Sequence, residues 1–371
     1  MRTSSVVLCV FVLAFPVYPA NTVTVAQLEQ FLTSSRAARL SDTEIAERLS
    51  RVDLSEELTS KSLARIVAES LPGPETQQQL ELLAAVSVIQ PPPRVELPGE
   101  PAPDQSTKQK IVRSARDYAR NALHIVPNYL AVRETLAFNN LPTESSNRHK
   151  KPTIEMHFAN ETRSGIAVRN GREVSSSLPG HEDSDHFGLS SGLSSWGEFG
   201  AVLAVILGDA SDESLHWHRW QRNESGMQMA VFGYKIPRSS SHYTVDFCCY
   251  RQAEDDAIEH AFRDKPGYHG EIYINPANGE VVQITLEADL SETDPVSRSA
   301  VAVEYGHVMI GGKRYVCPVR SVAILEGYNA DIKKIDGIGL ERHVNEVKFT
   351  DYHKFGSTVR ILTSADGTEQ H

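Results

Sequence analysis

The chain has 371 residues, of which 40% are hydrophobic and 23% are charged. This composition supplies enough apolar side chains for a sizeable folded core, which excludes an intrinsically disordered protein. The 37 basic residues are outnumbered by 48 acidic ones, giving a formal net charge of −11. Nucleic acid and anionic membrane surfaces are therefore not expected as partners, because both require a clustered basic face.

The first twenty residues have the pattern of a secretory signal peptide. Arg2 precedes an apolar run from Val6 to Phe15, which is followed by two prolines and Ala20. That run is shorter than the roughly 20 residues that span a bilayer, and no later run is long and apolar enough to do so. Residues 1–20 are thus predicted to be removed on export, and the mature chain is expected to be soluble in the periplasm or outside the cell.

Residues 21–90 carry apolar side chains at helical spacing with polar residues between them. Thr24 with Gln27, and Ser41 with Glu44, have the spacing of a capping box, in which two side chains satisfy the exposed amides at a helix start. This region is predicted to form a small bundle of about four short helices.

Residues 91–103 contain six prolines and are predicted to form an extended linker, because proline cannot join a helix interior or a central strand. The domain that follows, 104–363, is predicted to begin with a helix near 107–126. Residues 195–207 are predicted to form a second helix. Ser195 and Glu198 would form its capping box, and Gly208 would cap its C-terminus. Its apolar face would consist of Phe199, Val202, Leu203 and Ile206.

The rest of this domain has β character. Two hairpins are clearest, with turns at Asn278-Gly279 and Gly311-Gly312, where residues able to adopt positive φ let the strands fold back. Other β-rich runs occupy 129–138, 153–159, 166–174, 215–220, 227–236, 242–250, 344–350 and 358–362. About a dozen strands separated by short turns predict an α+β fold with a large, mostly antiparallel sheet, curled into a barrel or half-barrel with one or two packed helices. Residues 364–371 are predicted to be a disordered tail.

One helix followed by a long antiparallel meander, with an acidic turn after the strand QITLEAD, resembles the fold of periplasmic lipoprotein carriers (LolA-like) and of RseB-type periplasmic sensors. This resemblance covers roughly Asp104 to Leu362. The stretches SSWGEFGAVL, LHWHRW and EYGHVMIGGKRYVCPV also resemble a group of uncharacterised secreted bacterial proteins, a likeness that brings no function with it. The carrier resemblance implies a sheet curled around an apolar cavity that shelters an acyl chain or a lipidated partner.

A cluster of histidines and carboxylates is the main candidate metal site. The segment HEDSDH contains His181, Asp183 and His186, and the strand LHWHRW adds His216 and His218. Histidines two apart on a strand point to the same face, and imidazole with carboxylate suits Zn²⁺ or Mn²⁺. The spacing departs from the HExxH motif of zinc proteases, so a polar loop beside a half-buried strand is the simpler interpretation.

Strict alternation along LHWHRW makes a further prediction about its two faces. It places His216, His218 and Trp220 on one face of the strand, opposite Trp217 and Arg219.

Three cysteines remain after the predicted signal peptide. Cys248 and Cys249 point to opposite faces of one strand, so only one of them can face Cys317. In an oxidising compartment a disulfide from Cys249 or Cys248 to Cys317 is predicted, worth about 3 kcal/mol by loop-closure arguments. The alternatives are three buried thiols without a role, or a redox-active vicinal pair, although the sequence lacks a CxxC motif at a helix start.

The sequence contains no nucleophile elbow and no phosphate-binding loop signature. We therefore expect a non-enzymatic exported binding protein that uses its curled sheet to hold a lipid, an acyl chain or a partner polypeptide of the cell envelope. One alternative is a metal-dependent hydrolase built on His181, His186, His216 and His218, with Zn²⁺ or Mn²⁺ as its cofactor. Another is a structural or sensory envelope module in which the helical region contacts a partner.

Overall fold

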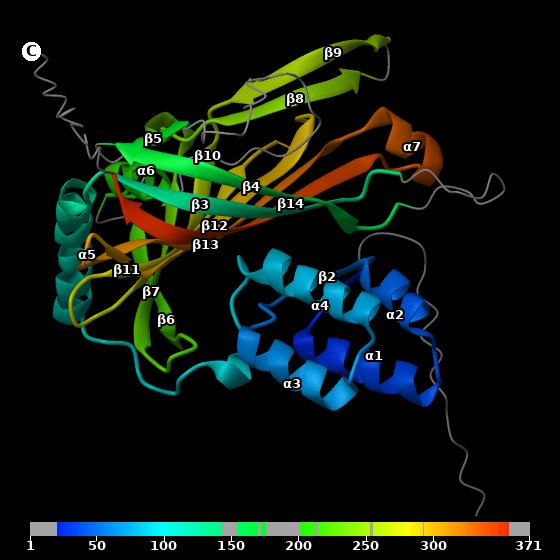
Figure 1. Cartoon of the computed structure of the whole chain (residues 1–371), viewed down its shortest axis with the longest axis horizontal. Coiled ribbons are helices and arrows are strands. Elements are labelled where there is room, and N and C mark those ends of the chain that lie inside the picture. The colour runs from blue at the N-terminus through cyan, green and yellow to red at the C-terminus, as the bar shows by residue number, and fades with distance from the viewer. Residues whose placement is uncertain are drawn as a thin grey trace, which may run out of the picture.

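The computed structural model describes residues 21–142, 154–169, 172–175, 201–211, 214–252, 255–291 and 293–355. In these ranges a small helical region precedes a large antiparallel sheet, so the predicted α+β class is confirmed. Figure 1 shows the helical region in blue and the strands in green to red. No helix within the described ranges is long and apolar enough to cross a membrane.

Four helices build the N-terminal region, as predicted. They are α1 (Val25–Ala37), α2 (Asp42–Leu49), α3 (Ser60–Ser70) and α4 (Pro74–Ser87), and beside them the short strands β1 (Asn21–Val23) and β2 (Val52–Leu54) pair in parallel. Both predicted capping boxes are confirmed: Thr24 and Ser41 accept hydrogen bonds from the amides of Gln27 and Glu44, whose side chains accept from the N-cap amides. Leu28, Leu49 and Leu80 are fully buried between the helices.

The proline-rich linker is held against both parts of the molecule. It contains one short 3-10 helix, η1 (Arg94–Glu96). Glu96 accepts hydrogen bonds from the hydroxyls of Thr59 and Ser62 at 2.8 and 2.6 Å, which ties the linker to the start of α3. Trp220 donates from its indole Nε1 to the carbonyl of Pro101 at 2.9 Å, which ties the linker to the sheet. The linker is therefore a packed strap between the helical region and the sheet.

Ten strands form one open antiparallel sheet in the order β5-β4-β3-β14-β13-β12-β11-β10-β7-β6. Its edges, β5 and β6, do not pair with each other in the described part of the chain, so the sheet is not a closed barrel. The strands are β3 (Tyr129–Asn139), β4 (His157–Arg169), β5 (Arg172–Ser175), β6 (Leu215–Arg222), β7 (Gln228–Ile236), β10 (Gly267–Ile274), β11 (Val281–Asp289), β12 (Val296–Ile310), β13 (Lys313–Tyr328) and β14 (Leu340–Lys354).

Strands of this sheet that follow each other in the chain are neighbours in it, except β5 and β6, which lie at opposite edges. The two predicted hairpins form β10–β11 and β12–β13, and their turns use Gly279 and Gly312 with φ of 77° and 80°. Between β7 and β10 the chain leaves the sheet to make a separate two-stranded ribbon, β8 (Val245–Gln252) and β9 (Asp255–Asp264). The last strand, β14, returns to pair with the first, β3, so that both ends of the domain meet inside the sheet.

Several predicted boundaries need correction. The runs predicted at 153–159 and 166–174 are instead one long strand, β4, followed by β5. The prediction missed β9 and the helix α7 (Ala330–Asp336), whose first turn is capped by Asn329 and whose end is Gly337 in the left-handed conformation. The run at 358–362 lies outside the described residues.

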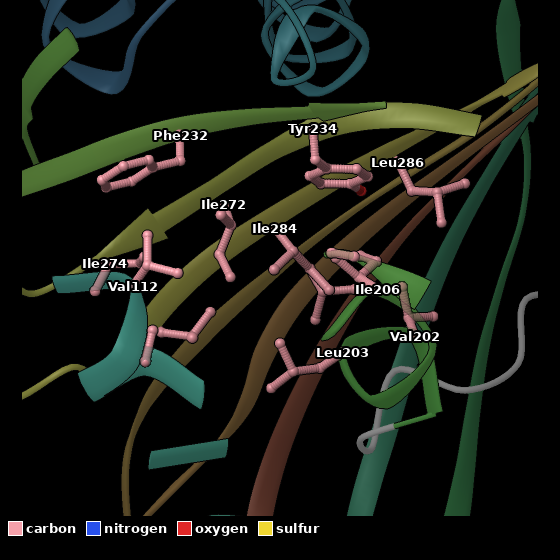
Figure 2. Packing of buried hydrophobic residues seen from close by; sticks show 14 of the residues in the cluster. Val112, Val202, Leu203, Ile206, Phe232, Tyr234, Ile272, Ile274, Ile284 and Leu286 are labelled. Atoms are coloured by element: carbon pink, nitrogen blue, oxygen red, sulfur yellow. The ribbon is translucent and has the colours of Figure 1, made fainter. Parts of the chain in front are cut away.

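One face of the sheet is covered by two helices, α5 (Gln105–Ile125) and α6 (Ala201–Asp209). Figure 2 shows Leu203 and Ile206 of α6 directed at Ile284 of the sheet, and Val112 of α5 near Ile274 in the same cluster. Ile206 and Ile284 are 0% exposed. We call this surface the α5/α6 face. It is packed as a protein core, and the predicted apolar face of the second helix is confirmed there for its described residues.

The residues at the ends of α5 and α6 agree only in part with the sequence prediction. Asp104 caps α5 by accepting from the amide of Thr107 at 2.7 Å. Gly208 does not cap α6 as predicted, because the helix continues to Asp209. The carboxylate of Asp209 accepts a hydrogen bond from the Tyr268 hydroxyl at 2.9 Å. Ser195 and Glu198, the predicted capping box, lie outside the described residues, as does Phe199.

The opposite face of the sheet is covered by α4. Successive residues of β12 alternate between the two faces: Val301 and Val303 contact the α5/α6 core, whereas Ala300 and Ala302 pack with Leu82 of α4. We call this second surface the α4 face (Figure 1). The N-terminal region is thus docked on the sheet, and both faces of its central strands are covered by helices of the same chain.

Candidate binding site on the α4 face

The residues predicted to hold a metal are only partly brought together. His216 and His218 lie side by side on β6, with ring centroids 4.6 Å apart. His181, Asp183 and His186 lie outside the described residues. Within the described ranges there is no group of three or more histidine, cysteine, aspartate or glutamate residues that could hold a metal ion. The five-residue metal site therefore stays a prediction.

A β-bulge changes which side chains of β6 share a face. The register between β6 and β7 shifts between Trp217 and Arg219, so strict alternation fails at His218. Arg219 joins His218 on the α4 face, whereas Trp220 lies beside Trp217, with ring centroids 4.8 Å apart. The predicted grouping of Trp220 with the two histidines is wrong for this reason, since one extra residue in the strand reverses the faces of all residues after it.

Glu271 on β10 is the centre of the polar cluster that results. It accepts two hydrogen bonds from Arg219, at 2.5 and 2.8 Å, one from the Tyr273 hydroxyl at 2.8 Å, and lies 2.6 Å from Nδ1 of His218. Burial alone would raise the pKa of Glu271, but the hydrogen bonds from His218 and Arg219 outweigh it and lower the pKa to about 2. The carboxylate is therefore ionised and rigidly held.

A second guanidinium lies on the same face, further into the sheet. Arg320 of β13 donates to Glu304 of β12 at 2.6 Å and to Glu346 of β14 at 2.8 Å. Glu304 is the direct cross-strand partner of Arg320, whereas Glu346 lies diagonally across from it on β14, and all three are partly buried. Arg219 and Arg320 thus each stand among carboxylates beneath the N-terminal region.

Glu57 comes to this surface from the N-terminal region, in the segment between β2 and α3. Burial, and then the negative charge of Glu304, raise its pKa to about 8, although the positive charge of Arg219 opposes the shift. Its side chain makes no hydrogen bond or ion pair with any residue of the described ranges. Glu57 is therefore largely protonated near neutral pH, and as a neutral acid it can donate a hydrogen bond to a ligand.

The docking of the two parts is fixed by ion pairs around the cluster. Arg342 of β14 donates to Asp53 of β2 at 2.7 Å and contacts Glu326 of β13 at 2.8 Å. Arg51 reaches Glu155 at 2.5 Å. The charged cluster, which we define as Glu57, Arg219, Glu271, Glu304 and Arg320, is held in place by these neighbours and by the packing of α4.

The predicted disulfide is not formed, because Cys317 is a free, buried thiol in the structure. Phe247, on the ribbon that carries Cys248 and Cys249, belongs to the same hydrophobic cluster as Leu325 of β13 and lies beside Gly327. Leu325 is eight residues from Cys317, which corresponds to about 26 Å along a strand, whereas a disulfide needs Cα atoms within about 7 Å. The side chains of Cys248 and Cys249 are not among those described. Burial raises the pKa of Cys317 to about 12, so its thiol is inert.

The charged cluster was missed by the sequence prediction, because its members come from residues 57, 219, 271, 304 and 320 and share no motif. Comparison with known proteins adds no assignment: no family model matches the chain, and neither a curated protein nor a solved structure does. The likeness to lipoprotein carriers and RseB-type sensors therefore stays a prediction. What the site can do must be argued from its own chemistry.

Proposed function

We propose that this chain is a non-enzymatic, exported binding protein of the cell envelope, and that its ligand is a partner polypeptide, not a free acyl chain. The observation that carries this choice is the packing of the α5/α6 face. An acyl chain would need an apolar hollow there, but Ile206, Ile284 and Val303 are 0% exposed and in one continuous core. Interiors of this density hold few voids larger than a water molecule.

A polypeptide has a different route to the sheet, along the edge strand β6. In the described part of the chain, its eight residues pair with β7 only. An edge strand with unpaired backbone groups can accept an added strand, with the backbone supplying affinity and neighbouring side chains supplying specificity. His218 and Arg219 of β6, with Glu271 of β10 in contact with both, place polar groups of both signs beside that edge.

The charged cluster supports recognition better than catalysis. Arg219 and Glu271 satisfy each other, and Arg320 is satisfied by two glutamates, so these groups form a fixed polar pattern. Such patterns set the partner and the register more than the affinity. The neutral acid of Glu57 adds a hydrogen-bond donor that a backbone carbonyl of a bound segment could satisfy.

The proposal is tested by site-specific photo-crosslinking in the cell that makes the protein. A photo-reactive residue is placed at His216 or at Arg222 on β6, and at the exposed Lys61 on α3 as a matched control. We expect crosslinks to a defined protein from both β6 positions and none from Lys61. Crosslinks to lipid, or the same products from all three positions, would contradict binding at this edge.

A further inference from the structure

We propose that His216 and His218 form a two-nitrogen binding site for a divalent late transition-metal ion, of the class of Cu²⁺, Ni²⁺ and Zn²⁺. The site lies on the α4 face of the edge strand β6 and is independent of whether a polypeptide binds there. It needs no third protein ligand, since water can complete the coordination.

The geometry brings the two Nε2 atoms to one place. Gly233 of β7 is the cross-strand partner of His216. A methyl group built on Gly233 would lie 2.2 Å from Nε2 of His218 and 2.7 Å from Nε2 of His216. Both nitrogens are therefore close to a single point above the glycine, and only glycine leaves room for the two rings, whose centroids are 4.6 Å apart. The bulge after Trp217 still keeps both histidines on this side of the strand.

A carboxylate fixes the chemical form of one of the two ligands. Nδ1 of His218 lies 2.6 Å from Oε1 of Glu271. A carboxylate in this position accepts, so Nδ1 carries the hydrogen and Nε2 keeps the lone pair that a metal requires. Arg219 holds Glu271 in turn, through two hydrogen bonds. A histidine bound on its far side by a carboxylate is the arrangement that orients metal-ligating imidazoles in proteins.

The chemistry of the donors selects the class of ion. Imidazole nitrogen suits copper, nickel and zinc, whereas Mg²⁺ and Ca²⁺ prefer oxygen ligands. For a given set of nitrogen donors Cu²⁺ binds most tightly of the divalent first-row ions. Both histidines are exposed, so an ion from solution can reach them without any opening of the fold.

The test is a titration of the whole protein with CuCl₂ and with ZnCl₂, measured by isothermal titration calorimetry. Electron paramagnetic resonance of the copper-bound samples reports the nitrogen ligands. The variants are His216→Ala, His218→Ala and the pair together. His242→Ala is the matched control, because His242 is also exposed and also held through Nδ1 by a carboxylate, that of Asp209, at 2.5 Å. A further variant replaces His181 and His186 with alanine.

We expect the His216→Ala/His218→Ala variant to lose roughly tenfold or more in Cu²⁺ affinity and to lose the spectral splitting from two imidazole nitrogens. His242→Ala and the His181→Ala/His186→Ala variant should keep both. Circular dichroism of each variant establishes that it is folded. Unchanged affinity in the His216→Ala/His218→Ala variant, dependence on His181 and His186, or no copper binding above that of a metal-free control protein would overturn the proposal.

Discussion

Replacement of Glu57 by glutamine should make the folded chain more stable at alkaline pH and flatten its pH dependence. The folded state raises the pKa of Glu57 from its ordinary value of 4.5 to about 8, chiefly through burial. Between these two values the folded chain binds more protons than the unfolded chain, so the free energy of unfolding falls as pH rises. The effect is absent below about pH 4.5 and complete above about pH 8.

The largest possible slope for one proton is about 1.4 kcal/mol per pH unit. Glu57 is half-buried, and screening by solvent reduces this, so we expect about 1–3 kcal/mol in total between pH 5 and pH 8. Glutamine has the shape of the neutral acid and carries no proton to lose. The variant should therefore match the parent near pH 5 and exceed it near pH 8.

Urea unfolding at pH 5, 6, 7 and 8 measures this difference directly, with the slope of unfolding on urea checked for constancy. Glu47→Gln, at an exposed position on α2, is the matched control and should show no such trend. If the stability difference between Glu57→Gln and the parent is the same at all four pH values, Glu57 is not a buried neutral acid and its place in the charged cluster is misassigned.

Three further predictions address the sheet. Ile206→Ala should lower the free energy of unfolding by about 2–5 kcal/mol, because it empties a fully buried site under α6, whereas Ala204→Ser on the exposed side of α6 should change it little. Arg219→Met should cost about 3–5 kcal/mol, because it removes the guanidinium paired with the partly buried carboxylate of Glu271, which among the described residues keeps only its contacts with Tyr273 and His218. Adding Glu271→Met should recover part of this loss, and purely additive losses in urea unfolding would argue against the pair. Cys317 should resist alkylation until the chain unfolds, and mass mapping that finds it labelled in the native state would contradict its burial.

The features that the sequence predicted well depend on residues close together in the chain. Thr24 and Ser41 predict the starts of their helices because each forms a capping box with a residue three positions later. The glycines at 279 and 312 predict the turns of their hairpins because these positions have positive φ, which other residues rarely adopt. A local signal for α7 also existed, in Asn329 before it and Gly337 after it, and could have been used.

The features that the sequence could not predict depend on distant pairing. The β14–β3 pair joins residues about 200 positions apart, such as Val344 and Phe138, and no local pattern specifies it. The bulge at His218 is set by how β6 fits against β7, and it reverses the faces of every later residue of the strand. The charged cluster depends on this bulge and on the docking of the N-terminal region, because Arg219 contacts Glu271 from the bulged strand and Glu57 belongs to the N-terminal region.

The central claim is that the described residues of the α5/α6 face leave no hollow for an acyl chain, and that the proposed ligand is a polypeptide. Native mass spectrometry of the protein, purified without detergent from the cell that makes it, tests this most directly when combined with organic extraction of the same sample. We predict a mass equal to that of the polypeptide, with no stoichiometric fatty acid or phospholipid in the extract. A bound lipid at one equivalent per chain, lost when Ile206 is replaced by tryptophan, would contradict the account and favour the lipid-carrier function that was predicted from the sequence.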